Sequence, residues 1–165
     1  MAETMYLARL TCQAVQDSVW SMPAPTTTAP SKGTVLIADD DPEILTMLSI
    51  RLSKKGYKVL EAADGLQTLH MARSQRPDLV LLDVMMPGKN GWEVARELRG
   101  DAALADIGIV MLTAIGEKVN EMTSPLYGAD DFVDKPFDFA DLETKIARVI
   151  QSTHERRAQR KGSSK

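Results

Sequence analysis

The sequence is poor in cysteine and histidine, and these shortages exclude whole classes of protein. Cys12 is the only cysteine, so no intramolecular disulfide can form, and we expect the chain to work in a reducing compartment. The two histidines, His70 and His154, lie far apart in the sequence and, with a single thiol, cannot form the imidazole and thiolate cluster of a typical zinc site. No apolar run is long enough to cross a bilayer, and the N-terminus lacks a basic segment followed by an apolar stretch. We therefore expect a cytoplasmic protein with no membrane partner.

The composition is that of one soluble domain with short appendages. The 165 residues are 44% hydrophobic and 26% charged, close to the globular average. The segment after residue 150 holds five basic residues and one acidic residue, a charge of +4, which leaves −7 for the rest of a chain whose net charge is −3. A body this acidic suits nucleic acid poorly, since that binding depends on Lys and Arg neutralising phosphates. We therefore do not expect nucleic acid to be a partner.

Composition also divides the chain into three parts. Residues 22–33 are rich in Pro, Thr and Ala and hold almost no large apolar side chain, which predicts a linker. We expect an N-terminal extension and linker at 1–33, a folded domain at 34–151 and a basic C-terminal tail at 152–165. The simplest prediction for the tail is that it continues the last helix and ends as a solvated basic segment.

From residue 34 onward, short apolar runs alternate with longer segments of helical period. The predicted strands are residues 34–38, 57–62, 79–83, 107–113 and 131–134. Runs such as VLIA and LVLLD are apolar at consecutive positions, which suits strands covered on both faces, as in a parallel sheet between helices. Asp41 and Pro42 are typical of a helix start, and we interpret Asp130 and Asp131 as a solvated turn. Five strand and helix units together predict a doubly wound α/β domain.

Polar residues follow four of the five predicted strands. Asp39 and Asp40 come after the first strand, Asp83 ends the third, Thr113 ends the fourth, and Lys135 lies just past the fifth. Since parallel strands bring their carboxyl ends to one edge of a sheet, these side chains should meet there. Converging carboxylates need protonation or a hard divalent cation to coexist, and an all-oxygen set of donors favours Mg²⁺. With a hydroxyl and an ammonium group nearby, such a site could stabilise a phosphoryl group during transfer.

Four motifs occur in order along the chain and at compatible spacing: LIADDDP, DLVLLDVMMPGKNGWEV, VMLTA and GADDFVDKPF. Together they resemble the motifs of the response-regulator receiver domain, and the likeness covers about residues 34–151. The resemblance implies a flavodoxin-like fold, which is a doubly wound five-stranded parallel sheet in strand order 2-1-3-4-5 with helices on both faces. The chain looks like a stand-alone receiver of the chemotaxis-regulator type.

The resemblance also implies which residues bind the metal ion. Asp83 would be the phosphoacceptor, and Asp39, Asp40 and Asp83 would hold Mg²⁺ together with the backbone carbonyl of Met85. These roles agree with the physical expectation of a hard cation among converging carboxylates.

The remaining implied roles concern the phosphoryl group and the response to it. Thr113 and Lys135 would contact the phosphoryl oxygens, and Lys135 and Pro136 would be joined by a cis peptide. Thr113 and Phe132 would form the switch, because a hydroxyl drawn toward the phosphoryl group leaves space into which the aromatic ring can rotate.

A receiver of this kind would take a phosphoryl group from a sensor histidine kinase or a histidine phosphotransfer protein and then present a changed surface to a downstream protein target. It would not be an enzyme in the ordinary sense, since it catalyses only its own phosphorylation and dephosphorylation. Ser124 and Pro125 disfavour helix where the family's fourth helix should lie, which puts the family's usual dimer in doubt. We therefore expect a monomer or a weak dimer.

Three other functions compete with this one. The chain could be a phosphorylation-independent scaffold with a receiver-like fold, although every acid, Thr and Lys position of the site is present. It could be the receiver fragment of a larger regulator. It could also be a Mg²⁺-dependent phosphohydrolase, although Val84 and Met85 follow Asp83 in place of a second acid two residues on.

Overall fold

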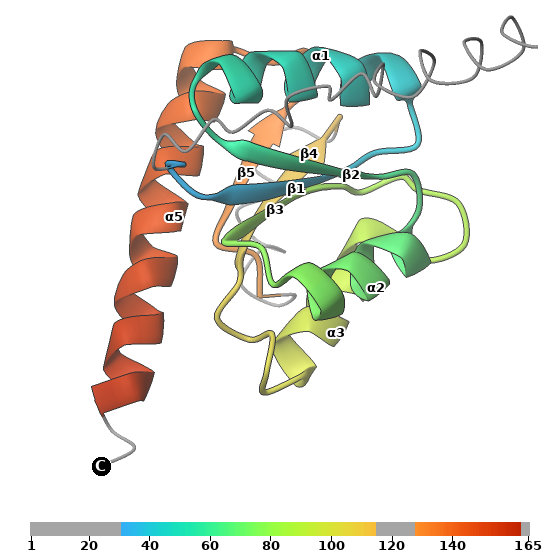
Figure 1. Ribbon diagram of the computed structural model, residues 1–165. Coiled ribbons are helices and arrows are strands. Elements are labelled where there is room, and N and C mark those ends of the chain that lie inside the picture. Colours follow the sequence, from blue (N-terminus) through green and yellow to red (C-terminus); the bar gives the residue numbers. More distant parts are fainter. Residues whose placement is uncertain (1–30, 115–127, 163–165) are drawn as a thin grey trace, which may run out of the picture.

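The protein forms one five-stranded parallel sheet between two layers of helices (Figure 1). The structure is a computed structural model and describes residues 31–114 and 128–162. The elements in chain order are β1 (Thr34–Ala38), α1 (Pro42–Lys54), β2 (Lys58–Ala62), α2 (Gly65–Gln75), β3 (Leu79–Asp83), α3 (Gly91–Gly100), β4 (Gly108–Thr113), β5 (Asp131–Asp134) and α5 (Phe139–Gly162). The N-terminal extension up to residue 30 and the dipeptide Ser124-Pro125 lie outside the described residues.

The sheet has the strand order β2-β1-β3-β4-β5, and every neighbouring pair runs parallel. This confirms the predicted doubly wound, flavodoxin-like sheet. The bounds of β1, β3 and β5 are those predicted, whereas β2 and β4 each begin one residue later. The difference is within the fraying that is normal at the ends of elements.

The apolar runs of the central strands are buried on both faces, as expected. Along β1, Val35 and Ile37 pack in the layer under α1 and α5, while Leu36 and Ala38 pack in the layer under α2 and α3 (Figure 1). Every residue of β3 and of β4 is buried. Because side chains alternate between the two faces along each strand, they pack into two hydrophobic cores, one on each side of the sheet.

The first helix begins as its sequence predicts. The side chain of Asp41 accepts the backbone N–H of Glu43 at 2.8 Å, and Pro42 occupies the first turn, where its missing N–H costs nothing. Asp41 is thus confirmed as a helix cap. The cap fixes the direction in which the chain leaves β1, immediately after Asp39 and Asp40.

The last helix runs on to Gly162, beyond the domain boundary predicted at residue 151, and its added turns pack against the body. Twenty-four residues make a helix of roughly 36 Å, which extends past the amino edge of the sheet (Figure 1). Thr153 is fully buried. Three arginines of this segment bind one aspartate in each of the turns before β3, β4 and β5: Arg157 with Asp78, Arg160 with Asp106, and Arg156 with Asp130.

These ion pairs, called the arginine ladder below, correct two sequence expectations. The basic segment does continue the last helix and Arg160 is exposed, but its three arginines are also paired with carboxylates of the body. Asp130 does lie in an exposed bend before β5, as expected, but its side chain is only 20% exposed, because its carboxylate also binds Arg99 and accepts the backbone N–H of Ile109 at 2.8 Å. Asp131 is buried at the start of β5 and pairs with Arg148. At Asp131, the turn preference of Asp was outweighed by its place in β5 and its pairing with Arg148.

None of the described helices is both long and apolar enough to span a membrane.

The arginine ladder gives a stability prediction. Arg157 donates to the carbonyl of Pro77 at 2.7 Å and pairs with Asp78, whose other oxygen accepts the N–H of Thr34 at 2.8 Å. Because the Arg157 side chain is only 30% exposed, we expect Arg157→Gln to lower the free energy of unfolding by about 1 kcal/mol in urea denaturation. Arg160→Gln is the matched control and should cost less, since the Arg160 side chain is 52% exposed and many exposed ion pairs contribute nothing measurable. An equal or larger loss for the control would contradict the prediction.

Candidate functional site

Three carboxylates converge at the carboxyl edge of the sheet. Asp39 and Asp40 follow β1, and Asp83 ends the adjacent parallel strand β3, so the topology delivers them to one place. One oxygen from each lies within 4.8 Å of the others. Asp39 and Asp83 are buried while Asp40 is exposed, which gives the cluster a buried floor and one side open to solvent. The convergence predicted from the strand ends is therefore present.

Lys135 bridges the two buried carboxylates. Its ammonium group lies 2.7 Å from Oδ2 of Asp39 and 3.2 Å from Oδ1 of Asp83. The loop that carries it is tied to β4, because the N–H of Lys135 donates to the carbonyl of Thr113 at 2.7 Å. The peptide between Lys135 and Pro136 is cis, as the family likeness implied. The sequence placed Lys135 near the cluster but did not reveal that it binds Asp39 more closely than Asp83.

The charges in the cluster shift two pKa values. Burial raises the pKa of Asp83, and the nearby charge of Asp39 raises it further, while the attraction of Lys135 acts in the opposite direction. Burial alone would lower the pKa of Lys135, but its hydrogen bonds and attraction to Asp39 and Asp83 outweigh burial and raise it. Lys135 therefore stays charged, and a further positive charge near Asp83 would relieve the crowding of carboxylates.

The oxygen donors fit a hard divalent cation. The three carboxylates converge without a sulfur or imidazole donor, which is the chemistry that Mg²⁺ prefers. Exposed Asp40 leaves a side on which water can complete the coordination of such an ion. The predicted share of the Met85 backbone carbonyl stays a prediction; the Met85 side chain is 74% exposed and points its apolar surface to solvent.

The two residues predicted to form the switch lie beside the cluster on the last two strands. Thr113 ends β4 and is buried, one position beyond Leu112, which is the sheet partner of Asp83. Phe132 lies on β5 and is half-buried against the core under α2 and α3. Thr113 therefore belongs to the rim of the cluster, whereas Phe132 sits one strand further out.

Gly91 is a residue of this site that sequence reasoning missed. It is the first residue of α3, where its N–H donates to the carbonyl of Val84 at 2.9 Å. A Cβ at this position would overlap the carbonyl oxygen of Asp83. Asn90, which caps α3, directs the chain into this contact. The signal was available in the pair Asn90-Gly91, since glycine next to a cap permits close backbone approach.

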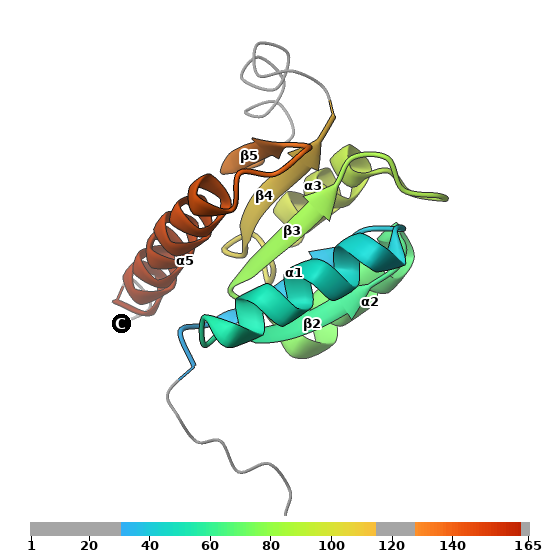
Figure 2. The same cartoon turned by 90° about the horizontal axis from the view of Figure 1, so that it is seen from above.

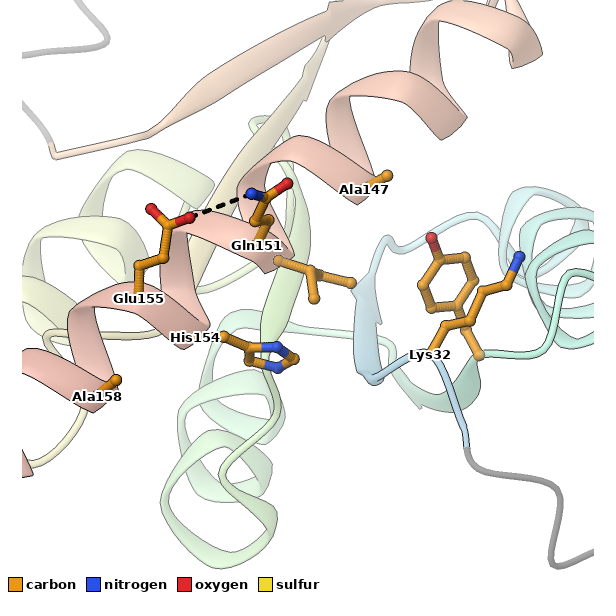
Figure 3. A pocket seen from close by; sticks show the side chains of 8 residues that line it. Lys32, Ala147, Gln151, His154, Glu155 and Ala158 are labelled. Atoms are coloured by element: carbon orange, nitrogen blue, oxygen red, sulfur yellow. Dashed lines mark hydrogen bonds between the residues drawn. The ribbon is translucent and has the colours of Figure 1, made fainter.

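A separate groove of about 530 Å³ lies at the opposite edge of the sheet, between α5 and the residues that precede β1 and β2 (Figure 3). It is lined by Lys32, Tyr57, Ile150 and His154, among others. No group of three potential metal ligands is found there among the described residues. The acidic cluster and this groove thus lie in different places, and the acidic cluster is the better candidate site.

Known proteins are similar to this chain in sequence and in architecture. The family model for the response regulator receiver domain matches residues 35–147. The phosphate regulon transcriptional regulatory protein PhoB of Pseudomonas aeruginosa is 41% identical over 120 residues, which cover 73% of this chain and 52% of that protein. The DNA-binding dual master transcriptional regulator RpaA of Synechocystis is 39% identical over 119 residues, covering 72% of this chain and 49% of that protein. This chain thus spans about half the length of the curated relatives it matches.

A solved structure resembles this chain in fold. The receiver domain of a sensor histidine kinase from Pseudomonas aeruginosa has a TM-score of 0.66 and 30% sequence identity, covering 72% of this chain and 98% of that one. That structure has a magnesium ion coordinated in its active site cleft.

The raised pKa of Asp83 gives a prediction for stability without divalent metal. A carboxyl whose pKa is higher in the folded than in the unfolded protein makes stability fall as pH rises between the two values. At pH values above the folded pKa, the folded protein carries the full free-energy cost of burying the ionised Asp83 carboxylate. We therefore expect Asp83→Asn to raise the melting temperature at neutral pH by a few degrees, the scale of change produced by about 1 kcal/mol, and the gain to vanish at pH values below the unfolded pKa.

The control for this measurement is Asp40→Asn, which removes an exposed carboxylate of the same cluster and should change the melting temperature less. Added Mg²⁺ should stabilise the wild type more than Asp83→Asn. A lower melting temperature for Asp83→Asn at neutral pH without metal would refute the prediction.

The close approach at Gly91 gives a second prediction. Gly91→Ala would push α3 away from the Asp83 carbonyl, and we expect it to lower the free energy of unfolding by about 1–3 kcal/mol. It should also weaken Mg²⁺ binding measured by calorimetry, because Asp83 is displaced. Gly100→Ala, at the other end of the same helix, meets no atom within 4 Å and should leave both quantities unchanged or slightly improved. Equal effects of the two substitutions would contradict the assignment.

Proposed function

The chain belongs to the response regulator receiver domain family, and from this we propose that its Asp83 accepts a phosphoryl group from a phosphohistidine. The observation that supports the proposal most directly is the buried carboxylate of Asp83 in contact with Lys135 at the acidic cluster. Phosphoryl transfer needs little covalent help from a protein and much neutralisation of charge, which this arrangement supplies.

In the proposed reaction, a carboxylate oxygen of Asp83 attacks phosphorus as the bond from phosphorus to the imidazole nitrogen breaks in line with it. The imidazole leaves with the electron pair of that bond. Lys135 already lies 3.2 Å from Asp83 and would donate to a phosphoryl oxygen, and the hydroxyl of Thr113 would donate to another. Asp39, Asp40, Asp83 and the backbone carbonyl of Met85 would hold Mg²⁺, whose charge offsets that of the phosphoryl oxygens.

The response would pass through Thr113 and Phe132. A hydroxyl drawn toward the phosphoryl group leaves space beside β4, and the half-buried ring of Phe132 on β5 would rotate into it. The equilibrium between two surfaces then shifts toward the one that a downstream protein recognises. The donor would be a sensor histidine kinase or a histidine phosphotransfer protein, in the cytoplasm, and the receiver would be a monomer or weak dimer that turns over no separate substrate.

A second candidate is that this chain acts as the receiver part of a larger regulator. The observation in its favour is the length of the curated relatives, of which this chain spans about half. Those relatives are named as transcriptional regulators, one of them DNA-binding, so the expectation that nucleic acid is no partner gains no support from them. Within the described residues, the arginine ladder offers few free cations to a nucleic acid, because Arg156, Arg157 and Arg160 are already paired with carboxylates.

The test is incubation with phosphoramidate and Mg²⁺ followed by intact mass measurement. Phosphoramidate offers the same bond from phosphorus to nitrogen as phosphohistidine. We expect the wild type to gain the mass of one phosphoryl group and Asp83→Asn to gain none. Asp41→Asn is the matched control, because Asp41 caps α1 outside the cluster and its variant should be labelled like the wild type.

Two results would overturn the proposal. Absence of an adduct on the folded wild type in the presence of Mg²⁺ would favour the phosphorylation-independent scaffold. Sustained release of phosphate without any adduct would favour the phosphohydrolase.

A further inference from the structure

Lys145 of α5 makes three contacts, and two of them are with Phe132, the aromatic residue of the proposed switch. Its ammonium group donates to the backbone carbonyl of Phe132 at 2.9 Å and lies 5.2 Å from the centroid of the Phe132 ring. The same group pairs with Asp141, one turn earlier on α5, at 2.9 Å. The Lys145 side chain is 20% exposed, so these contacts hold it largely out of solvent. It is therefore fixed against both the backbone and the ring of one residue.

The position of β5 explains why a lysine can make these contacts. Within the described part of the chain β5 is an edge strand, with no neighbouring strand on one side of its backbone, and α5 lies beside that part of the sheet (Figure 2). Lys145 supplies the donor that a further strand would otherwise give to the carbonyl of Phe132. Its charge over the ring face adds a cation–π attraction. Asp141 holds the ammonium group in place for both.

Thr113 and Lys145 lie on opposite sides of Phe132. Thr113 belongs to β4, which pairs with the inner side of β5, whereas the Lys145 ammonium binds the carbonyl at its outer side. Rotation of the ring toward the space beside Thr113 would carry the ring away from the ammonium group. The hydrogen bond to the carbonyl can survive this rotation, but the cation–π contact cannot.

We propose that Lys145 is a positioning residue of the switch, which holds the Phe132 ring in its unphosphorylated position and is released from the ring when Asp83 is phosphorylated. The inference rests on the proposed function, since it presupposes that Asp83 is phosphorylated and that Phe132 responds. Lys145 does not touch the phosphoryl site, which is formed by Lys135 and the acidic cluster. It acts on the equilibrium between the two ring positions.

The size of the effect follows from linkage. A contact made in only one of two states multiplies the population ratio of those states by a factor set by the free energy of the contact. When the contact is removed, a ligand that prefers the other state binds more tightly by up to the same factor. A cation–π contact at a partly exposed site corresponds to a factor of about two to five. Removing the charge of Lys145 should therefore tighten binding of a phosphoryl analogue by that factor, whereas ordinary loss of stability would not tighten it.

The experiment is a titration with beryllium fluoride in the presence of Mg²⁺, followed through the amide resonances of Phe132 and Val133. We expect Lys145→Gln to reach half-saturation at a beryllium fluoride concentration about two- to fivefold lower than the wild type. Lys145→Met, which keeps the aliphatic stem, must shift in the same direction. Lys145→Arg keeps a cation over the ring and should match the wild type, as should Lys161→Gln, which removes the same charge further along α5.

The possible outcomes test the role of Lys145 separately from the phosphoacceptor function of Asp83. If all folded variants bind beryllium fluoride equally, or Lys145→Gln and Lys145→Met bind it more weakly, the role of Lys145 is refuted while the phosphoacceptor function stands. If the wild type neither binds beryllium fluoride nor takes a phosphoryl group from phosphoramidate, the proposed function itself fails.

Discussion

The contact between Lys135 and the buried carboxylates of Asp39 and Asp83 is the interaction on which the site depends. Parallel strand order forces Asp39 and Asp83 to one edge, and burial makes their charges costly. One ammonium group between them makes the arrangement tolerable without cancelling all of its negative charge. The remaining negative charge of the three carboxylates suits a hard cation. The raised pKa of Asp83 reflects its burial and the repulsion from Asp39 that Lys135 does not fully offset.

Much of the fold and part of the site could be predicted from the sequence, because both follow from local pattern. Consecutive apolar runs identified buried parallel strands, and residues at strand ends had to meet at one edge, which placed Asp83 and Asp39 together. The interaction of Lys135 with Asp39 depends on how the loop after β5 crosses the sheet, and 96 residues separate the two in sequence. No local pattern reports such a pairing.

The errors have the same origin. Asp130 has the local preferences of a turn residue, but Arg99 and Arg156 reach it from two other elements. The basic segment after residue 150 has the composition of a solvated tail, yet its arginines find carboxylates in turns that are distant in sequence and adjacent only after folding. Gly91 was overlooked because its importance lies in a backbone approach that no side chain announces.

The last helix is held against the body near both of its ends. Lys145 ties it to the edge strand, and twelve residues later Arg157 ties it to the turn before β3, roughly 18 Å along the helix axis. A helix held at both of these points cannot rotate about one of them without breaking the contacts at the other. A displacement of β5 would therefore either carry the whole helix with it or strain the contacts at its far end, so α5 couples the edge strand mechanically to the turns at the opposite edge of the sheet.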